Sequence, residues 1–457
     1  MEELNRLLHR VADEVTAFRG SLAERPVRNT GDLESVRRGF ATPLPQRPSP
    51  AAQVIEDLVA AARTGLMATP GPRFFGFVVG GALPAATAAD MLAVGWDQCA
   101  FNTALAPAAS AAEEVAGGWL KELLGIPSSA SVGFVTGAQS ANTVGLTAAR
   151  HHVLAEAGWD VERRGLQGAP SLRVVASEER HATIDRSLRL LGLGSDVVEP
   201  VRADSNGAMD VSHLAQVLAV GPKGPTIVCP QAAHLNPGAS GHLAAARGGV
   251  PSPPGRAPPD GASGVGAAPS PTTSHLTDGV DLADSWGCDA HKWLNVPYDS
   301  AFAFCSRPQV QVAAMSYTAS YLTGSGVVPG AADYTAESSR RARGFAVWAA
   351  LSELGRDGVS DLVDRCCRLA QRFAEGLVAA GYEVANEVVL NQVLVSFGDD
   401  ARTDRVIDAV QREGVCWMGG TIWRGRRFMR ISVSNYATTD KDVDRSLKSI
   451  LRVVDGT

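Results

Sequence analysis

The chain of 457 residues is too long for one small core and suits two or three packed units. Hydrophobic residues make up 45% and charged residues 20%, which is an ordinary globular composition. The formal net charge is −6, so the chain has no excess of basic residues and no nucleic-acid partner is expected.

The first half of the chain begins with helices and continues as an α/β pattern. Residues 1–15 form an amphipathic helix within an N-terminal helical segment that we place at 1–70. Short apolar strands, separated by helices, are then expected within residues 131–135, 172–177, 195–201 and 226–230. Such strands alternating with helices predict a mostly parallel sheet flanked by helices, in a large domain at 71–350.

The second half carries a different pattern. A Gly-rich loop at 323–332 precedes a long helix from about Arg340, and we place a domain boundary within 345–365. The strands and helices that follow indicate a small antiparallel sheet, and hence a small C-terminal α+β domain at 351–457.

Cysteines and apolar runs bear on the compartment. Seven cysteines are scattered without metal-ligand spacing, and Cys366 and Cys367 are adjacent. This pattern fits free thiols in a reducing compartment better than a disulfide framework. No segment has the apolar length to cross a bilayer, and residues 1–15 do not resemble a signal peptide. We therefore expect a cytoplasmic protein with no metal site and no membrane partner.

Lys292 lies in an unusual setting, "DSWGCDAHKWLNVPYDS" at 284–300, between His291 and Trp293. A buried lysine among apolar neighbours reduces the cost of burying its charge by lowering its pKa. The resulting neutral amine is a nucleophile that forms Schiff bases. The alternative is a snorkelling lysine at the end of a strand.

Three further features bear on Lys292. Gly137, Ala138 and Gln139 join a strand to a helix N-terminus, which either binds a phosphate or is a plain turn. His181 follows a strand and either stacks on a flat heterocycle or caps a helix. Asp260, which lies 32 residues before Lys292, either pairs with a pyridine nitrogen or is a turn aspartate.

This order of a phosphate turn, His, Asp and His-Lys resembles the group II pyridoxal-phosphate-dependent amino-acid decarboxylases of fold type I. The resemblance runs from "PRFFGFVVGGALPA" at 72–85, through "DAHKWLN" at 289–295, to "MRISVSN" at 429–435. It implies the aspartate aminotransferase-like fold, with a sheet of seven-stranded type. It also implies pyridoxal 5′-phosphate (PLP) as the cofactor and a small amino acid as the substrate. Finally, it implies a homodimer in which residues 74–81 of one subunit contribute to the site of the other.

The resemblance also implies a role for each matching residue. Lys292 would form the Schiff base and His181 would stack on the ring, both as catalytic residues. His291 and the backbone of Ala138 and Gln139 would hold the phosphate. Asp260 would pair with the pyridine nitrogen and Ala262 would pack on the ring. Tyr334, which follows the Gly-rich loop, would donate a proton to Cα in decarboxylation, or else it packs in the loop.

Several alternatives stay open. The rival reactions are those of a PLP-dependent aminotransferase or aldolase, and a catalytically impaired remnant is a third possibility. Arg430 either clamps the substrate carboxylate or pairs structurally with a neighbouring acid. The pocket residues show no pattern that would select one amino acid.

Residues 237–273 are anomalous because Pro, Gly, Ala and Ser dominate where a helix and a strand are expected. Asn236 and Asp260 keep the family spacing, so length is retained while apolar periodicity is lost. Two compensating frameshifts, in the gene or in its sequencing, would produce this composition. If the protein is made as written, we expect weak PLP binding, poor solubility and little activity; resequencing the gene tests this hypothesis.

Overall fold

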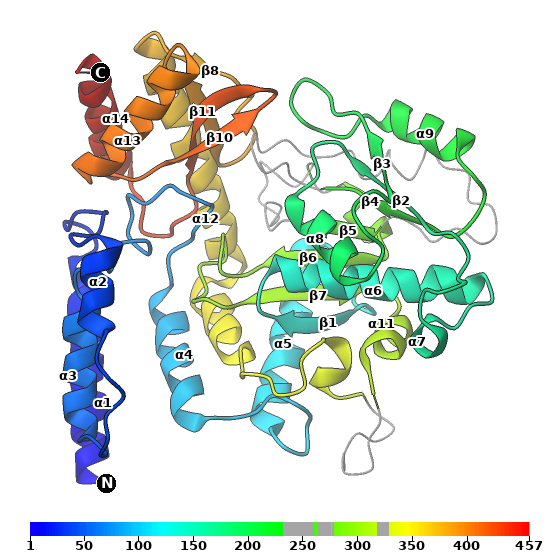
Figure 1. Cartoon of the computed structure of the whole chain (residues 1–457), viewed down its shortest axis with the longest axis horizontal. Coiled ribbons are helices and arrows are strands. Elements are labelled where there is room, and N and C mark those ends of the chain that lie inside the picture. The colour runs from blue at the N-terminus through cyan, green and yellow to red at the C-terminus, as the bar shows by residue number, and fades with distance from the viewer. Residues whose placement is uncertain (232–259, 264–275, 277, 318–328, 457) are drawn as a thin grey trace. The chain divides into compact units, whose positions relative to one another are not determined.

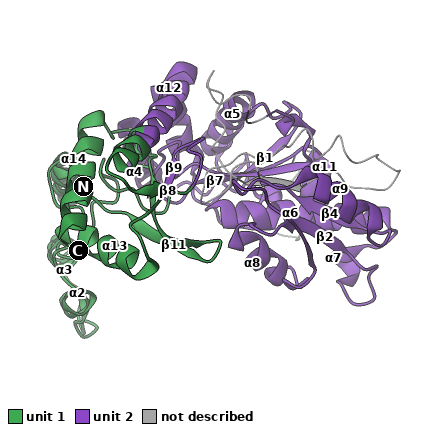
Figure 2. Cartoon of the chain, turned by 90° about the horizontal axis from the view of Figure 1, so that it is seen from above, with its two compact units in different colours: residues 1–81, 372–385, 394–457 green, residues 82–371, 386–393 purple. Residues whose placement is uncertain are grey.

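The computed structural model describes residues 1–231, 260–263, 276, 278–317 and 329–456, with only the backbone described for 260–263. The anomalous segment 237–273 therefore lies outside the described residues, apart from 260–263. The chain forms two compact units (Figure 2). The larger unit comprises 82–371 and 386–393, and the smaller comprises 1–81, 372–385 and 394–457.

The larger unit is built on seven described strands with helices around them (Figure 1). The strands are β1 Ser131–Val135, β2 Arg173–Ser177, β3 Val198–Val201, β4 Thr226–Cys229, β5 Asp260–Ser263, β6 Ser285–Asp289 and β7 Ala301–Cys305. The helices are α4 Pro84–Trp96, α5 Pro107–Leu124, α6 Ala138–Glu156, α7 Val161–Arg164, α8 Ala182–Leu190, α9 Val211–Val220, α11 Pro308–Met315 and part of α12 Gly344–Ala379, with short 3-10 turns η2 Val280–Leu282 and η3 Ala331–Tyr334.

Hydrogen bonding orders the strands as β1-β7-β6-β5 and β3-β2-β4, and β4 contacts β5. Strand β7 is antiparallel to β1 and β6, whereas the β5–β6, β2–β3 and β2–β4 pairs are parallel. Every residue of β2, β6 and β7 is buried, as in a sheet covered on both faces. The predicted α/β architecture with a mostly parallel sheet is confirmed.

Helices α6 and α8 cover part of this sheet through one apolar core. Leu154 and Leu188 are fully buried against Val174 of β2 and Ile227 of β4. Burial of this kind stabilises by about 1.5–3 kcal/mol for each large aliphatic side chain. The packing fixes the start of α6 beside the carboxyl ends of the strands.

The smaller unit contains a second sheet, in the order β10-β11-β9-β8. Its strands are β8 Glu383–Val384, β9 Gln392–Ser396, β10 Gly419–Trp423 and β11 Arg426–Ser432, and its helices are α1 Glu2–Ser21, α2 Leu33–Phe40, α3 Ala51–Ala62, α13 Asp400–Glu413 and α14 Asp440–Asp455. Strand β10 was not predicted, although the Arg424-Gly425 turn that joins it to β11 has positive φ at both residues, which suits a tight hairpin.

Residues 1–81 group with the C-terminal segments, and Arg73 is one of the residues that join them. Its buried guanidinium donates to the carbonyl oxygens of Val415, Ala23 and Arg25. The division into 1–70, 71–350 and 351–457 stays a proposal; helix α12, where we placed a boundary, contributes residues to both compact units. No helix among the described residues is long and apolar enough to cross a membrane.

Candidate cofactor site

Lys292 lies on a tight turn directly after β6. The backbone N–H groups of Ala290 and His291 both donate to the carbonyl oxygen of Ser300, at 3.0 and 3.2 Å. Ala290 and Trp293 are buried on either side, whereas the Lys292 side chain is 32% exposed. Burial of the neighbours therefore anchors the turn and leaves the amine of Lys292 accessible.

The carboxylate of Asp289, the last residue of β6, lies at the centre of this region. Its Oδ2 is 2.7 Å from Lys292 Nζ, and its Oδ1 is 3.4 Å from His291 Nε2. The backbone N–H of Ala138 donates to the same Oδ1 at 2.6 Å. The structure thus brings Ala138, which lies 151 residues before Asp289 in the sequence, together with His291 and Lys292 around one buried anion.

The start of α6 suits an anion for a local reason. Gly137 occupies the N-cap position in extended conformation and has no side chain that could cap the helix. The first N–H groups of a helix need partners, and the helix dipole favours negative charge there. A Cβ at Gly137 would lie 3.5 Å from Cε1 of His291, so the imidazole lies against this turn.

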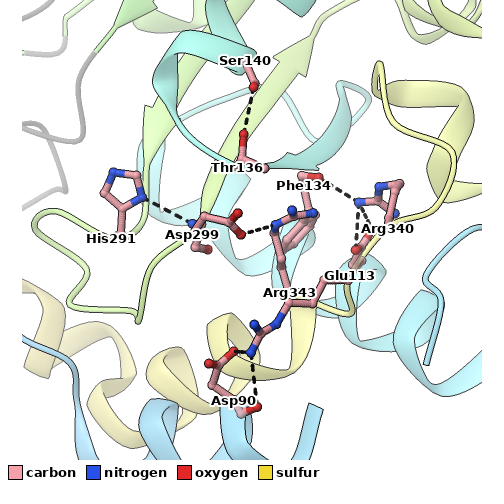
Figure 3. A network of polar contacts seen from close by, with 11 residues as sticks. Asp90, Glu113, Phe134, Thr136, Ser140, His291, Asp299, Arg340 and Arg343 are labelled. Atoms are coloured by element: carbon pink, nitrogen blue, oxygen red, sulfur yellow. Dashed lines mark hydrogen bonds and ion pairs between the residues drawn. The ribbon is translucent and has the colours of Figure 1, made fainter. Parts of the chain in front are cut away.

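His291 is held as a neutral imidazole. The N–H of Ser300 donates to its Nδ1 at 3.3 Å, which leaves the proton on Nε2, facing Asp289. Burial lowers the pKa of His291 below its ordinary value. The ring stacks on Tyr298 with centroids 4.3 Å apart, and the adjoining Asp299 accepts from Arg343 Nε at 2.7 Å (Figure 3).

His181 is the N-cap residue of α8, and its ring is fixed by a relay. Asn142 Nδ2 donates to Thr183 Oγ1 at 2.9 Å, and Thr183 Oγ1 lies 2.7 Å from His181 Nδ1. The N–H of Thr183 also donates to Nδ1. Because Nδ1 accepts the Thr183 N–H, Nε2 is the ring nitrogen left to carry a proton. The capping alternative is thus observed, and stacking on a heterocycle stays a prediction.

Gln139 joins α6 to α8. Its side-chain Nε2 donates to Ser187 Oγ at 2.8 Å and to the carbonyl of Thr183 at 3.3 Å. The expected phosphate contact of Gln139 uses its backbone, so this side-chain role is compatible with it. The relay and this link hold the His181 ring and the start of α6 in one packed assembly.

Tyr334 lies in η3, and its carbonyl oxygen accepts from Gln311 Nε2 at 2.7 Å. Burial, and then the charge of Asp333, raises the pKa of its phenol. Gln311 is fully buried and accepts from Ser131 Oγ at 2.6 Å, so η3 is tied to β1. These contacts fix the backbone at Tyr334, and its role as proton donor stays a prediction.

The remaining predicted site residues are placed less directly. Asp260 and Ala262 lie in β5, opposite Ser285 and Trp286 of the parallel strand β6. Their side chains are outside the described residues, so their cofactor contacts stay predictions. Arg430 lies in β11 of the smaller unit, where burial lowers its pKa to about 10. Both roles considered for Arg430 stay open.

The described groups fit a phosphorylated aldehyde cofactor. An accessible primary amine on Lys292 lies beside an N–H at a helix N-terminus, with His291 next to both. These are the chemical groups needed to attach an aldehyde and to bind a phosphate. One feature is unexpected, since the Asp289 carboxylate already occupies the point where the donors converge.

Comparison with known proteins decides the family. The family model described as "Pyridoxal-dependent decarboxylase conserved domain" matches residues 34–398. The chain belongs to the pyridoxal-dependent decarboxylase family. It is therefore a PLP-dependent amino-acid decarboxylase. This confirms the family predicted from the sequence.

Relatives of this decarboxylase cover nearly its whole length. It is 26% identical to the aromatic-L-amino-acid decarboxylase of Bacillus atrophaeus, over 97% of this chain and 93% of the relative. It is 23% identical to tyrosine decarboxylase 1 of Narcissus pseudonarcissus, over 98% and 92%. The solved structure of Oryza sativa TDC with PLP and tryptamine superposes with a TM-score of 0.91 at 20% identity, covering 100% of this chain and 98% of that one. The last likeness supports fold type I.

Sequence reasoning missed Asp289, Thr183 and Asn142. Asp289 was visible as the acid three residues before Lys292, at the end of a strand, but a single aspartate carries no spacing signal. Thr183 and Asn142 act through contacts between α6 and α8, and these arise only on folding.

Proposed function

We propose that this chain decarboxylates an L-amino acid at a PLP site centred on Lys292. The observation that carries the proposal is the convergence of Lys292 Nζ, His291 Nε2 and the Ala138 N–H on one position beside the N-terminus of α6. When bound, PLP supplies an electron sink for the electrons released as the Cα–carboxylate bond breaks. Membership of the decarboxylase family favours this reaction over transamination or aldol cleavage.

Each residue of the chain has a defined task in this proposal. Lys292 supplies the amine that would attach the cofactor covalently and give way to the substrate amine. The N–H groups of Ala138 and Gln139, with His291, would hold the phosphate. His181, with its ring fixed through Nδ1, would lie on the pyridine face.

Three further assignments complete the site and rest on the family resemblance. Asp260 would keep the pyridine nitrogen protonated, and Ala262 would pack against the ring. Tyr334 would return a proton to Cα after CO2 leaves; its phenol, with a raised pKa, keeps that proton at neutral pH.

We propose aromatic L-amino acids as the first substrate class to test, because the relatives include aromatic-L-amino-acid, tyrosine and tryptophan decarboxylases. The experiment is CO2 release from a panel of aromatic, acidic and basic L-amino acids with added PLP, and Lys292→Ala as the control. Release by the wild type alone supports the proposal. Keto-acid formation without CO2 would identify an aminotransferase, and inactivity towards every amino acid would favour the impaired remnant.

We also propose a cytoplasmic homodimer. Exposed apolar side chains lie on three helices of the larger unit, at Val94 and Trp96 of α4, Val115 and Trp119 of α5, and Trp348 of α12, and Trp119 stacks on Trp348. Clusters of this kind mark association surfaces. None of the seven cysteines, all of which are described, forms a disulfide, which suits a reducing compartment. Light scattering on the purified protein should give twice the chain mass; a monomer would contradict the dimer.

A further inference from the structure

Asp289 is the shared partner of the groups that the proposed function assigns to the cofactor. One oxygen accepts from the Ala138 N–H at 2.6 Å and the other lies 2.7 Å from Lys292 Nζ. His291 Nε2 lies 3.4 Å from the first oxygen. A carboxylate has two acceptor oxygens, as part of a phosphate does, and here both are used by this set of donors.

The position of Asp289 is fixed by the fold. It is the last residue of β6, paired with Ala301 of β7, and its side chain is only 6% exposed. A buried carboxylate is stable only when it is paired and hydrogen-bonded. Asp289 therefore depends on the Ala138 N–H and His291, which a phosphate would also use, and on Lys292, and it cannot turn to solvent without losing them.

A phosphate bound at the Ala138 N–H would lie close to the Asp289 carboxylate. Like charges about 4 Å apart in a partly buried site repel strongly, because water screens them poorly. The carboxylate would also have to give up its hydrogen bond from Ala138. Both effects oppose phosphate binding, while the ion pair with Lys292 can persist.

We propose that Asp289 is a resident anion that competes with the cofactor phosphate for the N-terminus of α6. In the cofactor-free protein it holds Lys292, His291 and the first turn of α6 together. It thereby stabilises the unloaded site and weakens the affinity for PLP. This inference rests on the proposed function, which places the phosphate at Ala138 and His291.

The test compares wild type with Asp289→Asn, which keeps the shape and an acceptor oxygen but removes the charge. PLP affinity is measured by quenching of tryptophan fluorescence, and inorganic phosphate is titrated in a thermal-shift assay as a probe that needs no lysine chemistry. We expect Asp289→Asn to bind both about ten-fold more tightly or better, since one like charge is removed. We expect the same variant to melt at a lower temperature without ligand, because the paired anion is lost.

Asp284→Asn is the matched control. Asp284 lies just before β6, at its other end, and pairs with Arg307 at 3.7 Å. Its substitution should alter stability without changing phosphate affinity. Asp289→Ser removes the same charge with a smaller side chain and should repeat the result of Asp289→Asn.

The outcomes separate this inference from the proposed function. If wild type binds PLP and both Asp289→Asn and Asp289→Ser bind it equally tightly or more weakly, the competition is overturned. The proposed cofactor site would then still stand. Failure of wild type to bind PLP or phosphate would overturn both. Failure of both Asp289 variants to fold would assign Asp289 a purely structural role and would also overturn the inference.

Discussion

Replacing Arg340 by methionine is expected to destabilise the larger unit by about 3–5 kcal/mol, because it leaves a buried carboxylate without its partner. Arg340 is fully buried, and its Nη2 donates to the two carboxylate oxygens of Glu113 at 3.0 and 3.2 Å. The same nitrogen donates to the carbonyl of Phe134 at 2.8 Å (Figure 3). Nη1 of Arg340 donates to the carbonyl of Ala100. The substitution removes all of these bonds together.

The cost has an upper limit that is set by Glu113. Burial raises the pKa of this carboxyl, even though Arg340 lowers it. Without Arg340, Glu113 takes up a proton rather than remaining a bare buried charge. An acid whose pKa is raised in the folded state does not reduce stability when the pH is below its pKa in the unfolded chain. As the pH rises above that unfolded pKa, the folded state becomes progressively less stable. The loss in Arg340→Met should therefore shrink as pH falls towards the ordinary glutamate value of 4.5.

The assay is urea unfolding of the cofactor-free protein, followed by tryptophan fluorescence. A second variant, Arg340→Met with Glu113→Leu, removes both charges and should recover to within about 2 kcal/mol of wild type. A loss below about 1 kcal/mol in the single variant would refute the reasoning. A double variant no more stable than the single one would refute it as well.

Three further predictions concern the elements around the site. Gly133→Ala should destabilise by about 1–3 kcal/mol in urea unfolding, since its Cβ would clash with the Tyr334 carbonyl oxygen of η3; Gly118→Ala, inside α5 with open space around its Cβ, should not destabilise and should stabilise by up to about 1 kcal/mol. Thr183→Val keeps the shape but breaks the relay to His181, so PLP affinity measured by fluorescence should fall, whereas an unchanged affinity would show that the relay is dispensable. The pKa of His291 is lower in the folded protein than its ordinary value of 6.5, so the unfolded chain binds the proton first as pH falls. The free energy of unfolding should therefore fall as pH drops below 6.5, by up to about 1.4 kcal/mol per pH unit. His291→Gln should lose this pH dependence when melting is measured at several pH values.

The sequence predicted the strands and helices that depend on local periodicity, and the motifs whose residues are neighbours in the chain. Short apolar runs predicted β2 and β4, and the apolar neighbours of Lys292 marked it as a candidate nucleophile. The Gly137-Ala138-Gln139 turn predicted the start of a helix, and α6 begins at Ala138. These features depend on neighbours a few residues away.

Contacts between distant segments could not be predicted in this way. The link from Arg73 to Val415 joins the N-terminal segment to the C-terminal one, and nothing in either sequence marks it. Asp289 looks like any acid at the end of a strand until α6 brings Ala138 to it. Polar networks of this kind depend on the complete fold, so a sequence pattern shows the residues without their partners.

The most direct measurement is covalent trapping of the cofactor on its lysine. The protein is incubated with PLP, reduced with borohydride and digested, and the labelled peptide is identified by mass spectrometry. The chain has only five lysines, Lys121, Lys223, Lys292, Lys441 and Lys448, so the result is unambiguous. We predict that the label lies on Lys292 and is absent from Lys292→Ala; label on another lysine, or none on the wild type, would contradict the account.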